Sequence, residues 1–199
     1  AYFEAFAQSV ERAKASICIA GWDINSETEL LRTDRAPSAS TKLGDLLDGV
    51  VSETPGLHAY ILAWDFNMIF ALERQPFPVF NLGWKTHRRV HFYQDGDHPA
   101  GASHHQKIVV IDDAVAFVGG LDLTKCRWDT SAHQVDEPRR RDPQGRPYPP
   151  FHDVQMLVDG EAARSLGGLF RRRWQHATGK QIAAPGGGGG PWPPSLKPD

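Results

Sequence analysis

The sequence has little of several features that mark particular protein classes. It contains only two cysteines, Cys18 and Cys126, whose separation fits neither a metal-binding nor a redox motif, so they indicate no compartment. Lysine and arginine total 22 against 24 aspartates and glutamates, so no excess positive charge favours binding to nucleic acid. No apolar run is long enough to cross a membrane, and no secretory signal is visible. The composition is otherwise that of an ordinary globular protein.

The 199 residues are enough for one sizeable core with a tail. The chain starts inside an amphipathic pattern, and we interpret it as a fragment. After Thr178 the composition changes, and the glycines and prolines of residues 185–199, PGGGGGPWPPSLKPD, predict a linker that cannot pack a core. We therefore predict a catalytic lobe over residues 1–179 and a linker over residues 180–199 that leads to a second lobe absent from this sequence.

Apolar periodicity predicts helices that alternate with strands. The expected helices cover residues 2–10, 42–51 and 161–177, and the expected strands cover residues 16–24, 58–65, 88–94, 105–111, 114–120 and 153–159. This order indicates an α/β fold with a mixed, largely parallel sheet flanked by helices on both faces. Residues 75–86 and 130–150 are expected to form irregular loops.

The stretch SHHQKIVVIDD, residues 103–113, places two histidines and a lysine at the mouth of an apolar strand. Residues two apart on a strand share a face, so His105 and Lys107 should point into one volume, with His104 and Gln106 on the other side. An imidazole beside an ammonium group suits a phosphate, because the imidazole can attack or carry a proton while the ammonium neutralises phosphoryl oxygens. Alternatively, His105 and Lys107 could be surface residues at the end of a strand with no catalytic role.

Other polar residues also stand at the ends of predicted strands. Asp23, Asp65 and His105 lie where open α/β sheets usually keep their sites. Trp22, Trp64 and Trp128 could be walls of a pocket, but aromatic residues at strand ends more often belong to the core. Trp22 and its neighbour Asp23 are therefore weaker candidates for the pocket.

Asp112 closes the same stretch but should not reach His105. Seven positions of extended chain span about 23 Å, and an odd separation puts the two side chains on opposite faces. We therefore predict that Asp112 caps backbone amides in a tight hairpin turn, which leaves the orientation of His105 to another group.

The pattern H-x-K-x-x-x-x-D, filled by His105, Lys107 and Asp112, resembles the signature of the phospholipase D superfamily. The flanking stretches AFVGGLDLTKCRWDT, YFEAFAQSVERAKASICIAGWDI and PFHDVQMLVDG resemble the same family, so the likeness extends to about Gly179. It suggests the N-terminal lobe of a bacterial-type phospholipase D or transphosphatidylase.

The resemblance implies a mechanism shared between two lobes. His105 would attack phosphorus to form a phosphohistidine, and a second motif in the missing lobe or a homodimer mate would protonate the leaving alcohol. No metal or other cofactor would be needed, because the two lysines supply the positive charge. The implied substrate is a phospholipid at a membrane surface, and nucleic acid is an unlikely partner. A cytoplasmic or peripheral membrane location would fit, although the sequence does not fix one.

Three further positions carry expectations. In the family an orienting carboxylate follows the variable loop, and Asp153 matches it. Gly119 and Gly120 should permit close approach of the backbone to a ligand or to packed chain. Asp122 stands where the family often has asparagine, and an inward carboxylate would repel phosphate. Asp122 should therefore either face away from the site or bond a cationic neighbour.

Several alternatives stay open. His98, His104, His105 and His152 could form a metal site, although adjacent histidines on a strand face opposite ways. The run Arg171–Arg173 could touch anionic headgroups or simply line a solvated helix face. The chain could instead belong to a nuclease-like phosphodiesterase formed by chain pairing, or be a non-catalytic lobe that binds phosphate or protein.

Overall fold

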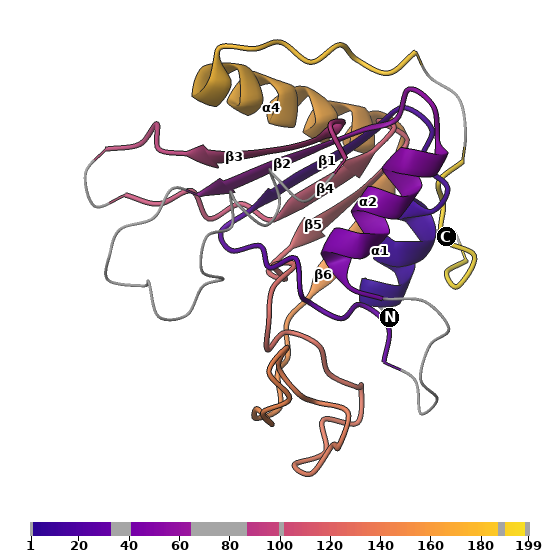
Figure 1. Ribbon diagram of the computed structural model, residues 1–199, viewed down its shortest axis with the longest axis vertical. Coiled ribbons are helices and arrows are strands. Elements are labelled where there is room, and N and C mark those ends of the chain that lie inside the picture. The colour runs from indigo at the N-terminus through magenta and orange to yellow at the C-terminus, as the bar shows by residue number, and fades with distance from the viewer. Residues whose placement is uncertain (1, 33–40, 65–86, 100–101, 187–189, 198–199) are drawn as a thin grey trace.

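The fold is a single mixed sheet between two helical layers (Figure 1). The computed structural model describes residues 2–32, 41–64, 87–99, 102–186 and 190–197. Its elements, in chain order, are α1 (Tyr2–Val10), β1 (Ser16–Gly21), α2 (Leu43–Glu53), β2 (His58–Trp64), β3 (Val90–Asp95), β4 (Ile108–Ile111), β5 (Val115–Gly119), β6 (Gln155–Asp159) and α4 (Gly160–Thr178). The α/β class predicted from the sequence is confirmed, and each expected helix and strand is present with slightly shifted ends.

The six strands are ordered β3-β2-β1-β4-β5-β6. The β1–β2 and β2–β3 pairs are parallel, whereas the β1–β4, β4–β5 and β5–β6 pairs are antiparallel. Strands β1, β2, β3 and β5 therefore run in one direction, and β4 and β6 run against them. The sheet is mixed as expected, and its parallel part is confined to the half that contains β1 to β3.

Each face of the sheet has its own apolar cluster. Helices α1 and α2 cover one face and α4 covers the other (Figure 1). In β1, Ile17 and Ile19 point toward α1 and α2, and Cys18 and Ala20 point toward α4, as the alternation of a strand requires. The central strands are buried on both sides, which explains why β1 and β4 are continuously apolar.

The C-terminal tail corrects one expectation. We expected residues 185–199 to pack no core, but Trp192 and Leu196 pack against the apolar cluster beneath α1. The Trp192 indole N–H donates to the Leu196 carbonyl at 2.9 Å, and the Ser195 amide donates to Gln8 on α1 at 3.0 Å. The expectation that the whole tail cannot pack is therefore wrong for this segment. That the tail serves as a linker remains a prediction.

Two expectations fall on parts of the chain that the structure leaves out. The predicted loop 75–86 and the strand-end residue Asp65 both lie outside the described residues. The other predicted loop, 130–150, is described and contains neither helix nor extended strand. Among the described helices, none combines the length and the apolar character that crossing a membrane requires.

Candidate active site

The predicted site residues gather at one edge of the sheet. This edge holds the carboxyl ends of β1, β2, β3 and β5 and the amino ends of β4 and β6, because the last two strands run the other way. Trp22 and Asp23 follow β1, Trp64 ends β2, Lys107 precedes β4, Gly119 ends β5 and Asp153 precedes β6. Most of the candidates that were chosen because they stand at strand ends therefore lie on the same side of the molecule.

His105 lies at this edge with an exposed side chain. Its ring contacts the Trp22 indole edge-to-face, with centroids 6.0 Å apart, and Trp22 in turn stacks on Trp64 at 5.6 Å. The paired indoles form an apolar wall beside the imidazole. Trp22 is half-buried and Trp64 is buried, so the two readings of these tryptophans, pocket wall and core, both hold in part.

His105 and Lys107 precede the strand rather than forming part of it, because β4 begins at Ile108. The alternation nevertheless persists. His105 and Lys107 lie toward Trp22 and Asp122, whereas His104 and Gln106 contact Asp95 and Arg173 on the other side. The Lys107 ammonium also donates to the His105 carbonyl at 3.3 Å, which ties the lysine to the backbone of the histidine.

Lys107 forms a buried ion pair with Asp122. The Nζ–Oδ2 distance is 3.1 Å, and the two side chains are 6% and 4% exposed. Asp122 Oδ1 also accepts the Trp22 amide at 2.8 Å and the Asp23 amide at 3.4 Å. The carboxylate therefore bonds a cation, one of the two arrangements that the sequence left open, and it fixes both Lys107 and the start of the loop after β1.

Asp23 is buried beside this pair. Its Oδ2 accepts a hydrogen bond from the Thr124 hydroxyl at 2.7 Å. Asn25 donates its amide to the Leu123 carbonyl at 3.0 Å. These bonds add to those of Asp122 in fastening the segment after β1 to the segment after β5. Asp23 thus has a structural role, because its hydrogen bond with Thr124 holds these two segments together.

Asp112 lies at the opposite end of β4, as its predicted turn role requires. Its Oδ1 accepts the Ala15 and Ser16 amides, each at 2.8 Å, and its Oδ2 accepts the Lys14 amide at 2.7 Å. Its φ of 55° places it in the left-handed region, which aspartate tolerates better than most residues. The carboxylate caps the amino end of β1 and holds the β4–β5 turn against it.

Asp153 lies over the glycine pair rather than against the imidazole. Its Oδ1 accepts the amide of the next residue, Val154, at 2.7 Å. A Cβ on Gly120 would stand 2.1 Å from Asp153 Oδ1, and one on Gly119 would stand 2.2 Å from the Val154 carbonyl oxygen. The glycines therefore permit close approach of packed chain, as predicted. Within the described part of the chain no carboxylate hydrogen-bonds the His105 ring, so the orienting role of Asp153 stays a prediction.

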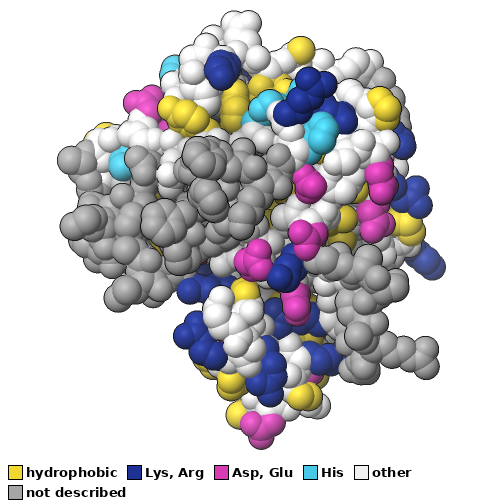
Figure 2. Space-filling model, viewed as in Figure 1, with side chains coloured by type: hydrophobic (Ala, Val, Ile, Leu, Met, Phe, Trp, Pro, Cys, Tyr) yellow, Lys and Arg dark blue, Asp and Glu magenta, His cyan; other side chains and the backbone are white. Residues whose placement is uncertain are grey.

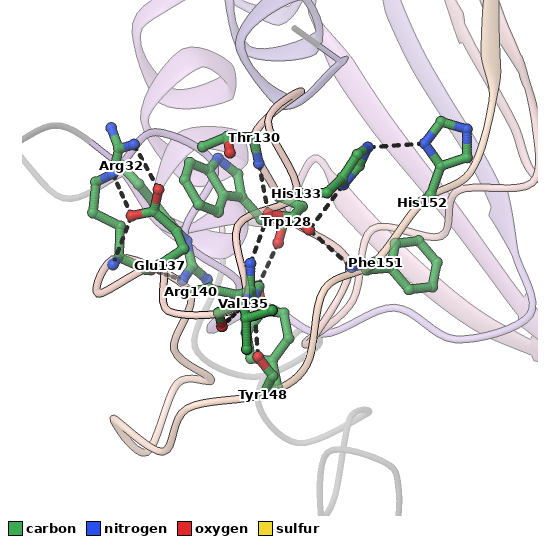
Figure 3. A network of polar contacts seen from close by, with 12 residues as sticks. Arg32, Trp128, Thr130, His133, Val135, Glu137, Arg140, Tyr148, Phe151 and His152 are labelled. Atoms are coloured by element: carbon green, nitrogen blue, oxygen red, sulfur yellow. Dashed lines mark hydrogen bonds and ion pairs between the residues drawn. The ribbon is translucent and has the colours of Figure 1, made fainter.

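The loop between β5 and β6 has a charged core of its own (Figure 3). The Arg140 guanidinium is buried and bonds Asp129 Oδ1 at 3.0 Å and the carbonyls of Val135 and Tyr148 at 2.6 and 2.8 Å. Burial raises the pKa of Asp129, but hydrogen bonds from the Phe151 amide, His133, the Thr130 amide and Arg140 outweigh it and lower the pKa to about 2. The loop is thus internally hydrogen-bonded, and it leads to residues 151–153 at the edge that holds the site.

The space-filling view shows lysine and arginine side chains over the protrusion that this loop forms (Figure 2). Several of them are engaged within the loop. Arg139 bonds Glu137, and Arg146 bonds Asp142. The positive side chains of this protrusion are therefore largely balanced by local carboxylates.

The histidines divide into separate pairs. His98 and His104 have ring centroids 5.7 Å apart, and His98 accepts the Trp64 indole N–H at 2.9 Å. His152 pairs instead with His133, at 3.0 Å between ring nitrogens. Among the residues that the structure describes, no group of three or more histidine, cysteine, aspartate or glutamate side chains converges in a way that could hold a metal ion.

Sequence reasoning missed Asp95 and Arg173 as parts of the site. Asp95 is the buried last residue of β3, and Arg173 Nη2 lies 2.7 Å from its Oδ2. The rule that picked Asp23 and Asp65 could have found Asp95, because its strand also ends in an aspartate at the same edge. Nothing in the sequence alone indicated that Arg173 reaches this edge from α4.

Comparison with known proteins settles the family. A family model described as Phospholipase D matches residues 84–184, which is half of the chain. The chain belongs to the phospholipase D family. Its relatives include phospholipase D C of Dictyostelium discoideum, 33% identical over 88% of this chain and 12% of that protein. Phospholipase D zeta 1 of Arabidopsis thaliana is 30% identical over 89% of this chain and 18% of that protein.

The phospholipase D relatives are much longer than this chain. Phospholipase D alpha 1 of Vigna unguiculata is 29% identical, with 89% of this chain aligned to 27% of that protein. The chain thus spans between an eighth and about a quarter of these three relatives. They are eukaryotic, whereas the sequence suggested a bacterial type.

Two solved structures share the fold. The Nuc protein of Salmonella typhimurium, a phospholipase D family member, matches with a TM-score of 0.52 and 12% identity over 88% of this chain and 87% of that chain. NucT of Helicobacter pylori matches with the same TM-score and identity over 85% and 84%. At this level of identity the likeness concerns the fold alone.

Proposed function

We propose that this chain is the N-terminal lobe of a phospholipase D-type phosphodiesterase that cleaves the headgroup ester of a phospholipid or transfers the phosphatidyl group to an alcohol. The observation that carries the proposal is the arrangement of His105 and Lys107. An exposed imidazole stands beside a buried ammonium group that is fixed by Asp122, at the edge where six strand ends meet.

The proposed reaction assigns a role to each group. A nitrogen of His105 attacks phosphorus, the bond from phosphorus to the headgroup oxygen breaks, and the headgroup alcohol leaves with a proton supplied by a histidine of a second motif. Water or an acceptor alcohol then loses its proton to that histidine and attacks phosphorus, which restores His105. Lys107 neutralises the phosphoryl oxygens during both steps. Asp153 is proposed to orient the imidazole once substrate and the second lobe are in place.

The aromatic wall supports a lipid substrate. Trp22, half-buried and backed by the buried Trp64, offers apolar surface directly beside His105, which suits a ligand with carbon chains or an alkyl headgroup. The formal net charge of −2 gives no general attraction for a polyanion such as nucleic acid. The runner-up, a nuclease-like enzyme formed by pairing of two chains, rests on no observation of this structure that favours it.

The proposal is tested by comparing this chain with the full-length protein. Both are assayed on phosphatidylcholine vesicles, on a chromogenic phosphodiester and on a single-stranded oligonucleotide. Lack of the general acid should reduce the rate of this chain alone by about 10²–10⁴-fold. Equal rates per site from a monomeric short chain would overturn the shared site, and preferential cleavage of the oligonucleotide would overturn the lipid substrate.

A further inference from the structure

The segment that carries His105 must be held by something other than the sheet. His105 lies three positions before β4 begins at Ile108, so no strand pairing fixes its backbone. A nucleophile that attacks phosphorus needs a well-defined position, because a displacement of about 1 Å can cost about a hundredfold in rate. The contacts of its two chain neighbours, His104 and Gln106, are therefore the ones that can fix its position.

Both neighbours attach to one buried ion pair. Asp95, at the end of β3, lies 2.7 Å from Arg173 Nη2 on α4, and the two side chains are 4% and 14% exposed. Asp95 Oδ2 is also 3.4 Å from His104 Nε2, and that nitrogen lies 3.1 Å from the Asp97 carbonyl. The other guanidinium nitrogen, Arg173 Nη1, donates to Gln106 Oε1 at 2.8 Å.

This arrangement grips the chain on both sides of His105. His104 is held through Asp95, Gln106 is held through Arg173, and Asp95 and Arg173 are held by each other. The forked guanidinium can bind the carboxylate with one nitrogen and the amide oxygen with the other, which a single ammonium group could not do in the same geometry. With His104 and Gln106 fixed toward α4, His105 and Lys107 are directed toward Trp22 and Asp122.

From this geometry we infer that Asp95 and Arg173 are positioning residues for His105. They touch neither substrate nor the reacting atoms, and they act by clamping the residues before and after the nucleophile. The inference rests on the proposed function for its effect on turnover. Its structural content, that breaking the pair moves the imidazole, does not depend on that function.

The molecule contains a matched control for this clamp. Arg171, on the same helix, forms an ion pair with Asp113 at 2.8 Å, with side chains 17% and 12% exposed. Asp113 belongs to the turn after β4, at the end of that strand away from His105. The Arg173 pair ties α4 to the end of β3, and the Arg171 pair ties α4 to the turn after β4. Both pairs are largely shielded from solvent, but only the Arg173 pair touches the neighbours of His105.

The test compares Arg173→Gln and Asp95→Asn with Arg171→Gln in the full-length protein. Turnover per folded molecule on a soluble phosphodiester should fall about ten- to a hundredfold in the first two variants, with KM little changed because Lys107 still meets the phosphate. Arg171→Gln should lose comparable thermal stability and keep kcat. Arg173→Lys should recover part of the lost kcat, since it retains a cation for Asp95 but not the second bond to Gln106.

A second measurement does not require activity. With ring-labelled histidine, the NMR signal of the His105 imidazole should shift or broaden in Arg173→Gln and stay in place in Arg171→Gln. Equal loss of kcat in the two glutamine variants, or an unmoved His105 signal in Arg173→Gln, would overturn the positioning role. Absence of turnover in the unmodified protein on every phosphodiester would instead count against the proposed function, and the NMR comparison would still decide the clamp.

Discussion

Lys107 and Asp122 form a buried ion pair in the candidate site, with 3.1 Å between Nζ and Oδ2. The lysine that should neutralise a phosphate is thus already balanced by a carboxylate before any substrate arrives. The balance lets Lys107 stay buried, since an unpaired buried ammonium group is costly. It also implies that an incoming phosphate shares the lysine with Asp122.

Replacing Asp122 with asparagine should therefore lower the stability of the fold while it strengthens the binding of anions. The amide keeps the shape and an acceptor for the Trp22 amide, but Lys107 loses its counter-charge, which should lower the free energy of unfolding by about 3 kcal/mol. The same change should tighten binding of inorganic phosphate, measured by calorimetry. Asp113→Asn is the control, because it breaks an ion pair far from His105 and should leave phosphate affinity alone. Unchanged phosphate affinity in Asp122→Asn would contradict the assignment of Lys107 to the phosphate.

Asp112→Asn should damage the fold and spare the chemistry. Asparagine tolerates the positive φ of this position, so the effect isolates the carboxylate, which accepts three amides from residues 14–16. Losing part of this cap should cost about 1–3 kcal/mol of stability. Urea unfolding and turnover per folded molecule are measured together. A fully folded variant without turnover would mean that Asp112 acts on His105 after all.

Gly120→Ala and Asp153→Asn should have matching effects if Asp153 orients the imidazole. A methyl group on Gly120 would occupy the place of the Asp153 carboxylate and should push that carboxylate away. In Asp153→Asn the carboxylate is instead replaced by an amide, so both variants remove it from its position. Both variants should lower kcat with little change in melting temperature. Gly49→Ala, on α2 where nothing lies within 4 Å of the added Cβ, is the control and should keep full activity. Full activity in Asp153→Asn would remove Asp153 from the mechanism.

A pair of histidines at the β2–β3 edge should make the fold sensitive to acid. His58 Nδ1 lies 3.0 Å from His91 Nε2, a contact that needs at least one neutral ring. Burial, followed by nearby positive charge, lowers the pKa of both imidazoles below the usual 6.5. The unfolded chain then binds more protons than the folded one, so stability should decrease as the pH falls below about 6.5 and level off below the folded-state pKa values.

The double variant His58→Gln/His91→Gln tests the origin of this pH dependence. Its free energy of unfolding should vary less between pH 7.5 and pH 5 than that of the unmodified protein. His176→Gln, on the last turn of α4, is the control and should retain the slope. An unchanged slope in the double variant would show that other groups cause the acid sensitivity.

The sequence alone was sufficient to predict the helices and strands and the placement of the polar residues at the two ends of β4. Helix and strand periods are local properties, and the His105–Lys107 spacing and the turn role of Asp112 follow from the geometry of a single strand. The arrangement of Asp122 could be narrowed to two options, facing away from the site or bonding a cation, because an unpaired buried carboxylate beside a phosphate is costly. The resemblance to a known family supplied Asp153, which no local rule singled out.

The Asp95–Arg173 pair and the tail could not be foreseen, because they depend on contacts between distant segments. Asp95 and Arg173 are 78 positions apart, and the run Arg171–Arg173 offers no local sign that two of its members point inward to different aspartates. Likewise, glycine and proline content predicts a linker that packs no core, whereas the partial burial of Trp192 depends on its contact with the apolar cluster that α1 and α2 cover. Tertiary contacts override local composition in both cases.

The central claim is that His105 is the nucleophile, and the most direct measurement is to trap its covalent intermediate. The full-length protein is mixed with phosphatidylcholine labelled with ³²P and quenched in alkaline denaturant, because a phosphorus–nitrogen bond survives alkali and is broken by acid. The account predicts acid-labile label on the peptide that contains His105, and no label there in His105→Asn. Label on a different residue, or turnover that persists in His105→Asn, would contradict it.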